Sequence, residues 1–276
     1  MRLVRFETKN GNSSGSGILE GDRIYQTSFT DSLLDTIRRG IKPEKTSRTF
    51  EIDEVNLLAP LKPGKILALG RNYADHAKEM GNEIPEKPLI FAKMTSSVIG
   101  PNQVIQWRES ITQQVDWEGE LAVVIGKRAS NVTAEEAPRY IFGYTIANDV
   151  SARDLQVSES QWARAKGLDT FCPLGPCVVS RDELSEVDHL SLETRLNGDV
   201  VQNGNTDQMI HKIPDLIAYL SKTFTLEPED VVLTGTPSGV GKGMKPPRFL
   251  TTGDTVSITI EGIGTLTNSC QIIPEA

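Results

Sequence analysis

Short runs of apolar residues separated by polar turns dominate the first part of the chain. Leu3–Phe6 and Ile18–Tyr25 alternate apolar and polar positions, which predicts β-strands placed around a turn at Asn12–Gly17. Ser32–Arg39 has the spacing of a short helix, and Gly40 follows at the position where a helix would end. This region is therefore predicted to be rich in β-strands.

A polar stretch and a pair of prolines separate this region from the rest of the chain. Pro43–Thr49 contains few apolar residues, which predicts a linker. Pro60 and Pro63 then interrupt the chain before a new apolar segment begins. We therefore predict two domains, a small N-terminal β-rich domain over residues 1–58 and a larger domain over residues 59–276.

The larger part of the chain alternates apolar runs with turns. The runs with the length and composition of strands are Lys65–Leu69, Leu89–Ala92, Leu121–Ile125, Ile141–Asn148, Cys177–Val179, Leu192–Leu196, Asp230–Leu233 and Val256–Ile260. Helical spacing is found near Ala134–Tyr140 and from Pro214, where proline suits a first helical turn. Many short strands with few helices predict a mainly β protein of the α+β class, built as a sandwich or a barrel-like roll.

Composition and charge narrow the classes of partner. The 276 residues include 29 Lys and Arg against 37 Asp and Glu, for a net charge of −8. Nucleic acids and anionic membranes select clustered basic residues, so we expect neither as a partner. The three cysteines form no CxxC pair, so the sequence suggests neither a zinc site nor a disulfide framework. With no apolar leader or membrane span, a cytoplasmic protein is expected.

Two acidic residues lie two positions apart at the start of an apolar run. On a strand, Glu118 and Glu120 would project from the same face, with Asp116 as a possible third member. A solvated strand face is the ordinary interpretation of such a pattern. The alternative is a buried face, because the residues after Glu120 are continuously apolar, and buried carboxylates require a cation.

A further acidic residue, Asp149, follows the apolar strand Ile141–Asn148. Two glutamates and an aspartate form an all-oxygen ligand set, which suits Mg²⁺ or Mn²⁺, with Ca²⁺ as a further option. Three carboxylates leave coordination positions free for water or a chelating substrate.

His76 and Glu79 stand three residues apart, a spacing at which one helical turn lets a carboxylate orient an imidazole. A catalytic pair and an ordinary surface pair are both consistent with this spacing. Lys166 by itself is typical of a solvated lysine. The glycine-rich segment Gly235–Gly243 resembles a phosphate-binding loop only superficially, because its spacing differs and no Ser or Thr follows Lys242.

Several ordered motifs together resemble the fumarylacetoacetate hydrolase family, over about Pro60 to Ser269. They are GRNYADH at 70–76, VDWEGELAVVIG at 115–126, NDVSARDLQ at 148–156, FCPLGP at 171–176, RLNG at 195–198 and TGTP at 234–237. The resemblance implies the β-roll of that family, a homodimer, and a divalent metal held by carboxylates. It also implies a small-molecule 2-oxo acid as substrate.

Matched to the family motifs, Glu118, Glu120 and Asp149 correspond to metal ligands, and His76 with Glu79 to a water-activating pair. The resemblance further implies that Lys166 faces the substrate near the metal. The positions expected to contact substrate are Arg71, Lys93, Gln156 and Thr236. The segment from His76 to Lys87 resembles a lid over the substrate.

The reaction expected from this resemblance is hydrolytic C–C cleavage of acylpyruvate-type acids through a metal-stabilised pyruvate enolate. Leu69 stands where fumarylacetoacetate hydrolase itself has an additional aspartate, which favours smaller substrates. Oxaloacetate decarboxylation or tautomerisation, and isomerisation of 2-hydroxyhepta-2,4-diene-1,7-dioate, pass through related enolates and are the alternatives. A non-catalytic metal- or ligand-binding module is the alternative outside enzyme function.

Overall fold

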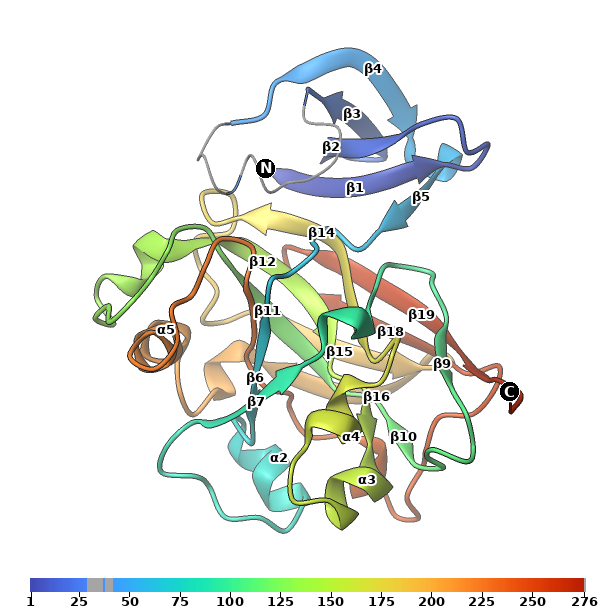
Figure 1. The fold of residues 1–276 in the computed structure, drawn as a ribbon, viewed down its shortest axis with the longest axis vertical. Coiled ribbons are helices and arrows are strands. Elements are labelled where there is room, and N and C mark those ends of the chain that lie inside the picture. Colours follow the sequence, from blue (N-terminus) through green and yellow to red (C-terminus); the bar gives the residue numbers. More distant parts are fainter. Residues whose placement is uncertain (29–36, 38–41, 276) are drawn as a thin grey trace.

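The computed structural model describes residues 1–28, 37 and 42–275. Strands predominate among these residues and the helices are short (Figure 1). The predicted mainly β fold of the α+β class is therefore confirmed. The predicted helix Ser32–Arg39 lies outside the described residues except for Ile37. No helix in the described ranges combines the length and apolar character needed to cross a membrane.

Twelve strands form one large sheet. Its main path runs β4-β3-β2-β1-β14-β12-β11-β17-β6-β7, while β5 pairs with β1 and β8 pairs with β14. The pairs β17–β6 and β14–β8 are parallel, and the other pairs are antiparallel. The strand bounds are β1 (Arg2–Thr8), β2 (Ser14–Glu20), β3 (Arg23–Thr27), β4 (Lys45–Glu51), β5 (Val55–Leu58), β6 (Ile66–Gly70), β7 (Leu89–Lys93), β8 (Val98–Ile99), β11 (Gly119–Ile125), β12 (Ile141–Asn148), β14 (Cys172–Ser180) and β17 (Val231–Leu233).

A second sheet of five strands has the order β16-β15-β18-β19-β9. Its strands are β9 (Ile105–Trp107), β15 (Ser191–Leu196), β16 (Asp199–Asn205), β18 (Thr255–Ile260) and β19 (Gly264–Ile272), and a separate pair joins β10 (Val115–Asp116) to β13 (Ser151–Ala152). The α-helices are α2 (Ala74–Glu79), α3 (Arg153–Ser158), α4 (Ala163–Gly167) and α5 (Ile213–Ser221). Short 3-10 helices occur at η1 (Ile52–Glu54), η2 (Thr95–Ser97), η3 (Ala137–Tyr140), η4 (Thr206–Gln208) and η5 (Gly241–Gly243).

Strand β11 runs through the centre of the molecule and is buried along its whole length. Leu121 and Val123 belong to the core cluster that includes Ile258 of the second sheet. Ala122 and Val124 point to the opposite face and belong to a separate core cluster. Because both faces are covered, the strand carries a continuous apolar run instead of an alternation.

The large sheet curls into a roll. Lys93 at the end of β7 has its Nζ atom 2.5 Å from Oδ1 of Asp149, which directly follows β12. In the sheet, however, β11, β17 and β6 separate β7 from β12. The sheet must therefore bend until its edge strand returns to the ends of β11 and β12. The short helices α2, α3 and α4 gather at this end of the molecule (Figure 1).

The N-terminal strands extend the large sheet through the pairing of β1 with β14. The predicted linker Pro43–Thr49 is wrong, because Lys45–Glu51 forms strand β4, paired with β3. Its side chains are mostly exposed, so an edge strand there needs no apolar residues. The predicted turn also lies earlier than Asn12–Gly17, since β2 begins at Ser14. The division at residue 58 stays a prediction.

After Pro60, each predicted strand is present. The helix predicted from Pro214 is α5, which buries Leu216, Ile217 and Leu220. The segment predicted near Ala134–Tyr140 is a 3-10 helix over its last four residues. Strands β16 and β19 were not predicted. The short strands β8, β10 and β13 were not predicted either, because runs of two residues carry no periodicity.

Candidate active site

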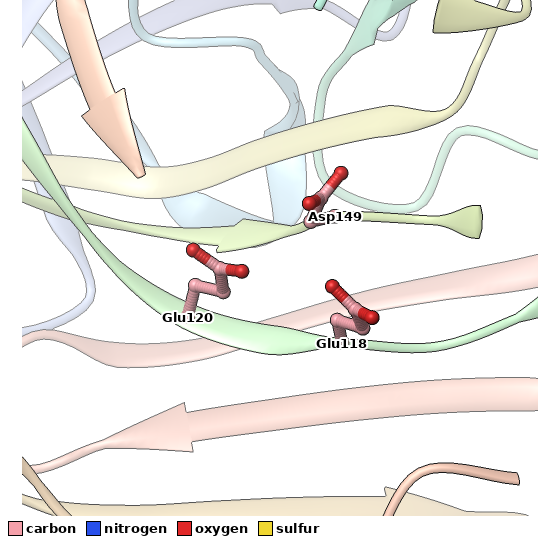
Figure 2. Close-up of side chains that lie close together, drawn as sticks. All are labelled: Glu118, Glu120 and Asp149. Atoms are coloured by element: carbon pink, nitrogen blue, oxygen red, sulfur yellow. The ribbon is translucent and has the colours of Figure 1, made fainter. Parts of the chain in front are cut away.

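Three carboxylates meet where β11 begins and β12 ends (Figure 2). Glu118 precedes β11, Glu120 lies on it, and Asp149 follows β12. The register pairs Gly119 with Asn148, and the backbone N–H of Asp149 donates to the carbonyl of Glu118 over 2.8 Å. One oxygen from each carboxylate lies within 4.8 Å of the others. The antiparallel pairing thus assembles the predicted ligand set.

The carboxylates are buried. The exposed fractions are 5% for Glu118, 1% for Glu120 and 0% for Asp149, so a solvated strand face is excluded. Glu118 and Glu120 share the face of β11 that carries Ala122 and Val124, as the period of two requires. Burial of this much negative charge needs cations nearby.

Three basic side chains provide part of that positive charge. Lys166 donates to Oε2 of Glu118 over 2.7 Å and to Oδ2 of Asp149 over 2.8 Å. Lys93 donates to the other oxygen of Asp149 over 2.5 Å. Arg153 lies with Nη2 2.7 Å from Oε1 of Glu118. Although burial by itself raises the pKa of Glu118, Lys166 and Arg153 lower it well below its usual range.

Glu120 is different, because no ion pair among the described residues reaches it. Its Oε2 atom accepts one backbone hydrogen bond, from Gly235 over 2.7 Å. Burial, followed by the charges of Asp149 and Glu118, raises the pKa of Glu120 well above its ordinary value. A buried carboxylate with this shortage of positive charge fits a divalent cation held by Glu118, Glu120 and Asp149.

His76 and Glu79 form a pair on the short helix α2. Nδ1 of His76 lies 3.3 Å from Oε2 of Glu79, and both side chains are largely buried. Oε1 of Glu79 accepts the backbone N–H of Gly239 over 2.9 Å, which fixes the carboxylate from its other side. Asn72 anchors the segment before α2 by donating to the carbonyl of Thr234 over 2.8 Å. The pair is therefore part of the interior and not an ordinary surface pair.

A cavity of about 230 Å³ lies beside these groups, and Asp149 and Glu79 are not among its lining residues. Of the residues predicted to bind substrate or to act in catalysis, His76, Lys166, Arg71, Gln156 and Thr236 line it. Glu118 and Glu120 also contribute to its wall. The apolar part of the wall includes Phe91 and Trp162, whose rings lie 5.3 Å apart between centroids.

One basic and one acidic residue lie elsewhere than expected. Lys93 does not line the cavity, because its side chain is fully buried behind Asp149 and supports that carboxylate. Asp116 is not a third member of the carboxylate cluster. It accepts from Nε of Arg153 over 2.8 Å and from backbone N–H groups of Trp117 and Gly241 over 2.9 and 2.7 Å.

Sequence reasoning missed two basic residues of the cavity wall, Arg153 and Lys242. Arg153 lies inside the NDVSARDLQ motif. It could have been predicted as a site residue, because several buried acids require several buried cations. Lys242 lies in the glycine-rich segment whose resemblance to a phosphate loop is only superficial. No pattern in the sequence indicates which wall that segment forms.

Comparisons with known proteins show which family the chain resembles. The family described as fumarylacetoacetate (FAA) hydrolase C-terminal matches residues 65–271, and the one described as Rv2993c-like, N-terminal matches residues 1–60. Oxaloacetate tautomerase YisK of Bacillus subtilis is 49% identical over 271 residues, covering 97% of this chain and 89% of the relative.

Solved structures give the same picture. A fumarylacetoacetate hydrolase from Exiguobacterium antarcticum is 41% identical with a TM-score of 0.90, covering 99% of this chain and 100% of that one. A 2-hydroxyhepta-2,4-diene-1,7-dioate isomerase from Mycobacterium marinum is 39% identical with a TM-score of 0.84, and both chains are covered fully, at 100% each. On this fold, site and similarity, the chain belongs to the fumarylacetoacetate hydrolase family.

Proposed function

We propose that this protein is a divalent-metal-dependent enzyme that interconverts the keto and enol forms of a small 2-oxo diacid, with oxaloacetate as the type substrate. The observation that carries the proposal is the buried carboxylate cluster, two of whose members line a cavity together with His76 and several cations. The 49% identity to an oxaloacetate tautomerase over 97% of the chain supports this choice of reaction.

Glu118, Glu120 and Asp149 are the residues that would hold the cation. Mg²⁺ and Mn²⁺ match an all-carboxylate set. Such an ion would supply Lewis acidity to a bound 2-oxo acid. This also explains how a protein of net charge −8 attracts an anionic substrate, because the local charge at the site is positive.

His76 and Lys166 have complementary roles in the proton transfer. Glu79 holds Nδ1 of His76, which leaves the lone pair on Nε2 of the same ring. This lone pair removes a proton from the substrate carbon that lies between the two carbonyl-bearing groups. Lys166, held between Glu118 and Asp149, places an ammonium charge where negative charge develops on the substrate oxygen. Return of the proton to the oxygen completes the tautomerisation. Gln156 and Thr236 line the cavity, and this position supports a role for them in contacting substrate.

Hydrolysis of acylpyruvates is a second candidate, favoured by the fixed His76–Glu79 pair. The same Nε2 atom can deprotonate a water molecule that attacks the distal carbonyl, and C–C cleavage then releases pyruvate as its enol form. Decarboxylation of oxaloacetate needs no water, and 2-hydroxyhepta-2,4-diene-1,7-dioate isomerisation needs only proton transfers. The shape of the cavity and its access to water decide among these outcomes.

The test follows the ultraviolet absorbance of enol-oxaloacetate, and pyruvate release from acetylpyruvate, with Mg²⁺, with Mn²⁺ and with a chelator. We expect metal-dependent acceleration of the enol decay, lost in Glu120→Gln and retained in Glu135→Gln, which changes an exposed carboxylate. His76→Asn is expected to reduce acetylpyruvate hydrolysis more than oxaloacetate decarboxylation. Enol decay that proceeds equally with chelator, or in Glu120→Gln, contradicts the proposal.

A further inference from the structure

The 3-10 turn η5 brings Lys242 to the wall of the active-site cavity. The other basic residues near the carboxylate cluster are used within the protein, since Lys93, Arg153 and Lys166 each form ion pairs there. Among the residues that the structure describes, no carboxylate forms an ion pair with Lys242. Its ammonium group is therefore available to an anion in the cavity.

The position of this turn is fixed by the same network that holds the site together. The backbone N–H groups of Gly241 and Lys242 donate to the two oxygens of Asp116 over 2.7 and 3.0 Å. Asp116 in turn binds Arg153, which contacts Glu118. The backbone of the turn that carries Lys242 thus has a defined place relative to the carboxylate cluster, which keeps its side chain at the wall of the cavity.

The surroundings of Lys242 favour the arrival of an anion. Partial burial, followed by the positive charge of Arg153, lowers the pKa of Lys242. An ammonium group that has lost water and faces another cation gains more from a bound carboxylate than a fully solvated lysine does.

We propose that Lys242 binds the second carboxylate of a 2-oxo diacid and so selects diacids over 2-oxo acids with an uncharged distal group. This inference rests on the proposed function, because it takes the first carboxylate and the 2-oxo group to face the cation that Glu118, Glu120 and Asp149 would hold. Arg71 is the other lining cation without an acidic partner among the described residues. Lys242 is the better candidate because hydrogen bonds to Asp116 fix the turn that carries it.

The test compares two ligands that differ only in the distal charge, oxaloacetate and its distal monoamide 2-oxosuccinamate. Binding of each to the Mg²⁺-loaded protein is measured by titration calorimetry. Loss of one charge-assisted contact lowers affinity by about tenfold or more. We expect the wild-type protein to prefer oxaloacetate by about that factor, and Lys242→Met to abolish the preference by weakening oxaloacetate alone. Lys242→Arg keeps the charge and should keep the preference.

Control variants distinguish a direct contact at Lys242 from a general effect of net charge. Lys127→Met removes one positive charge from an exposed position and should leave the preference intact. Equal affinity of the wild type for both ligands, or equal weakening of both by Lys242→Met, would overturn the inference. So would a preference that survives in Lys242→Met and disappears in Arg71→Met. If the protein fails to accelerate enol decay but the binding preference depends on Lys242, the proposed function fails and this inference stands.

Discussion

Glu120 is the site carboxylate that forms no ion pair among the described residues, so a variant that removes its charge is informative. Glu120→Gln keeps the size of the side chain and its capacity to accept from the Gly235 N–H, but removes one buried negative charge. In the metal-free protein this change should relieve repulsion from Glu118 and Asp149. We therefore expect Glu120→Gln to stabilise the metal-free protein while it destroys the metal site.

The size of the effect follows from the geometry. One oxygen from each carboxylate lies within 4.8 Å of the others. At an effective dielectric constant of about 20, each neighbour then repels Glu120 by about 3.5 kcal/mol. Attraction by Lys166 offsets part of this repulsion, so the net gain is on the order of 1–3 kcal/mol. The melting temperature should rise by roughly 2–4 °C for each kcal/mol.

Thermal unfolding of both proteins, with a chelator and with Mg²⁺ or Mn²⁺, measures this directly. The wild type should gain stability as the metal concentration exceeds its dissociation constant, whereas Glu120→Gln should gain little. Glu135→Gln, at an exposed position, serves as the control and should behave as the wild type. A metal-free Glu120→Gln protein less stable than the wild type, or one with a full metal-dependent shift, would refute this account of the cluster.

Three further predictions concern the same network. The pKa of Glu120 is raised in the folded state, so its contribution to the stability of the metal-free protein is complete below the ordinary pKa of 4.5 and is lost as pH rises through the higher folded pKa. The free energy of unfolding in urea should therefore fall over this pH range in the wild type, and Glu120→Gln should lack this fall. Lys93→Met should lower the free energy of unfolding in urea by about 3 kcal/mol, because it removes a buried partner of Asp149. A loss of only about 0–1 kcal/mol, which is typical of exposed ion pairs, would contradict this prediction. In Gly243→Ala the added methyl would lie 2.4 Å from Cδ of Glu79 and would displace this carboxylate. Turnover should therefore fall by up to about 10²-fold, whereas the metal-induced rise in melting temperature should persist. Unchanged turnover would show that the position of Glu79 is unimportant.

Local sequence predicted the carboxylate cluster well, because its geometry is set by neighbouring residues. The period of two places Glu118 and Glu120 on one face of β11, whatever the rest of the molecule does. Asp149 follows an apolar strand that pairs with β11 in register, which brings it to Glu118. His76 and Glu79 meet because one helical turn separates them.

Edge strands and short strands were harder to predict for a physical reason. Lys45–Glu51 pairs through its backbone while most of its side chains face solvent, so its composition does not differ from that of a linker. The hydrophobic pattern reports burial of side chains and not backbone pairing. The same limit applies to β10 and β13, whose pairing involves two residues on each side.

The residues that supply the negative charge of the site, and the His76–Glu79 pair on one helical turn, can be recognised from sequence spacing alone. The cations that balance this charge depend on long-range packing. Lys93 supports Asp149 because the curled sheet returns β7 to the end of β12, although it was expected to contact substrate. Lys242 reaches the cavity because a distant turn is hydrogen bonded to Asp116. Buried charges are matched by whichever groups the packing brings together, and sequence spacing does not specify contacts between residues far apart in the chain.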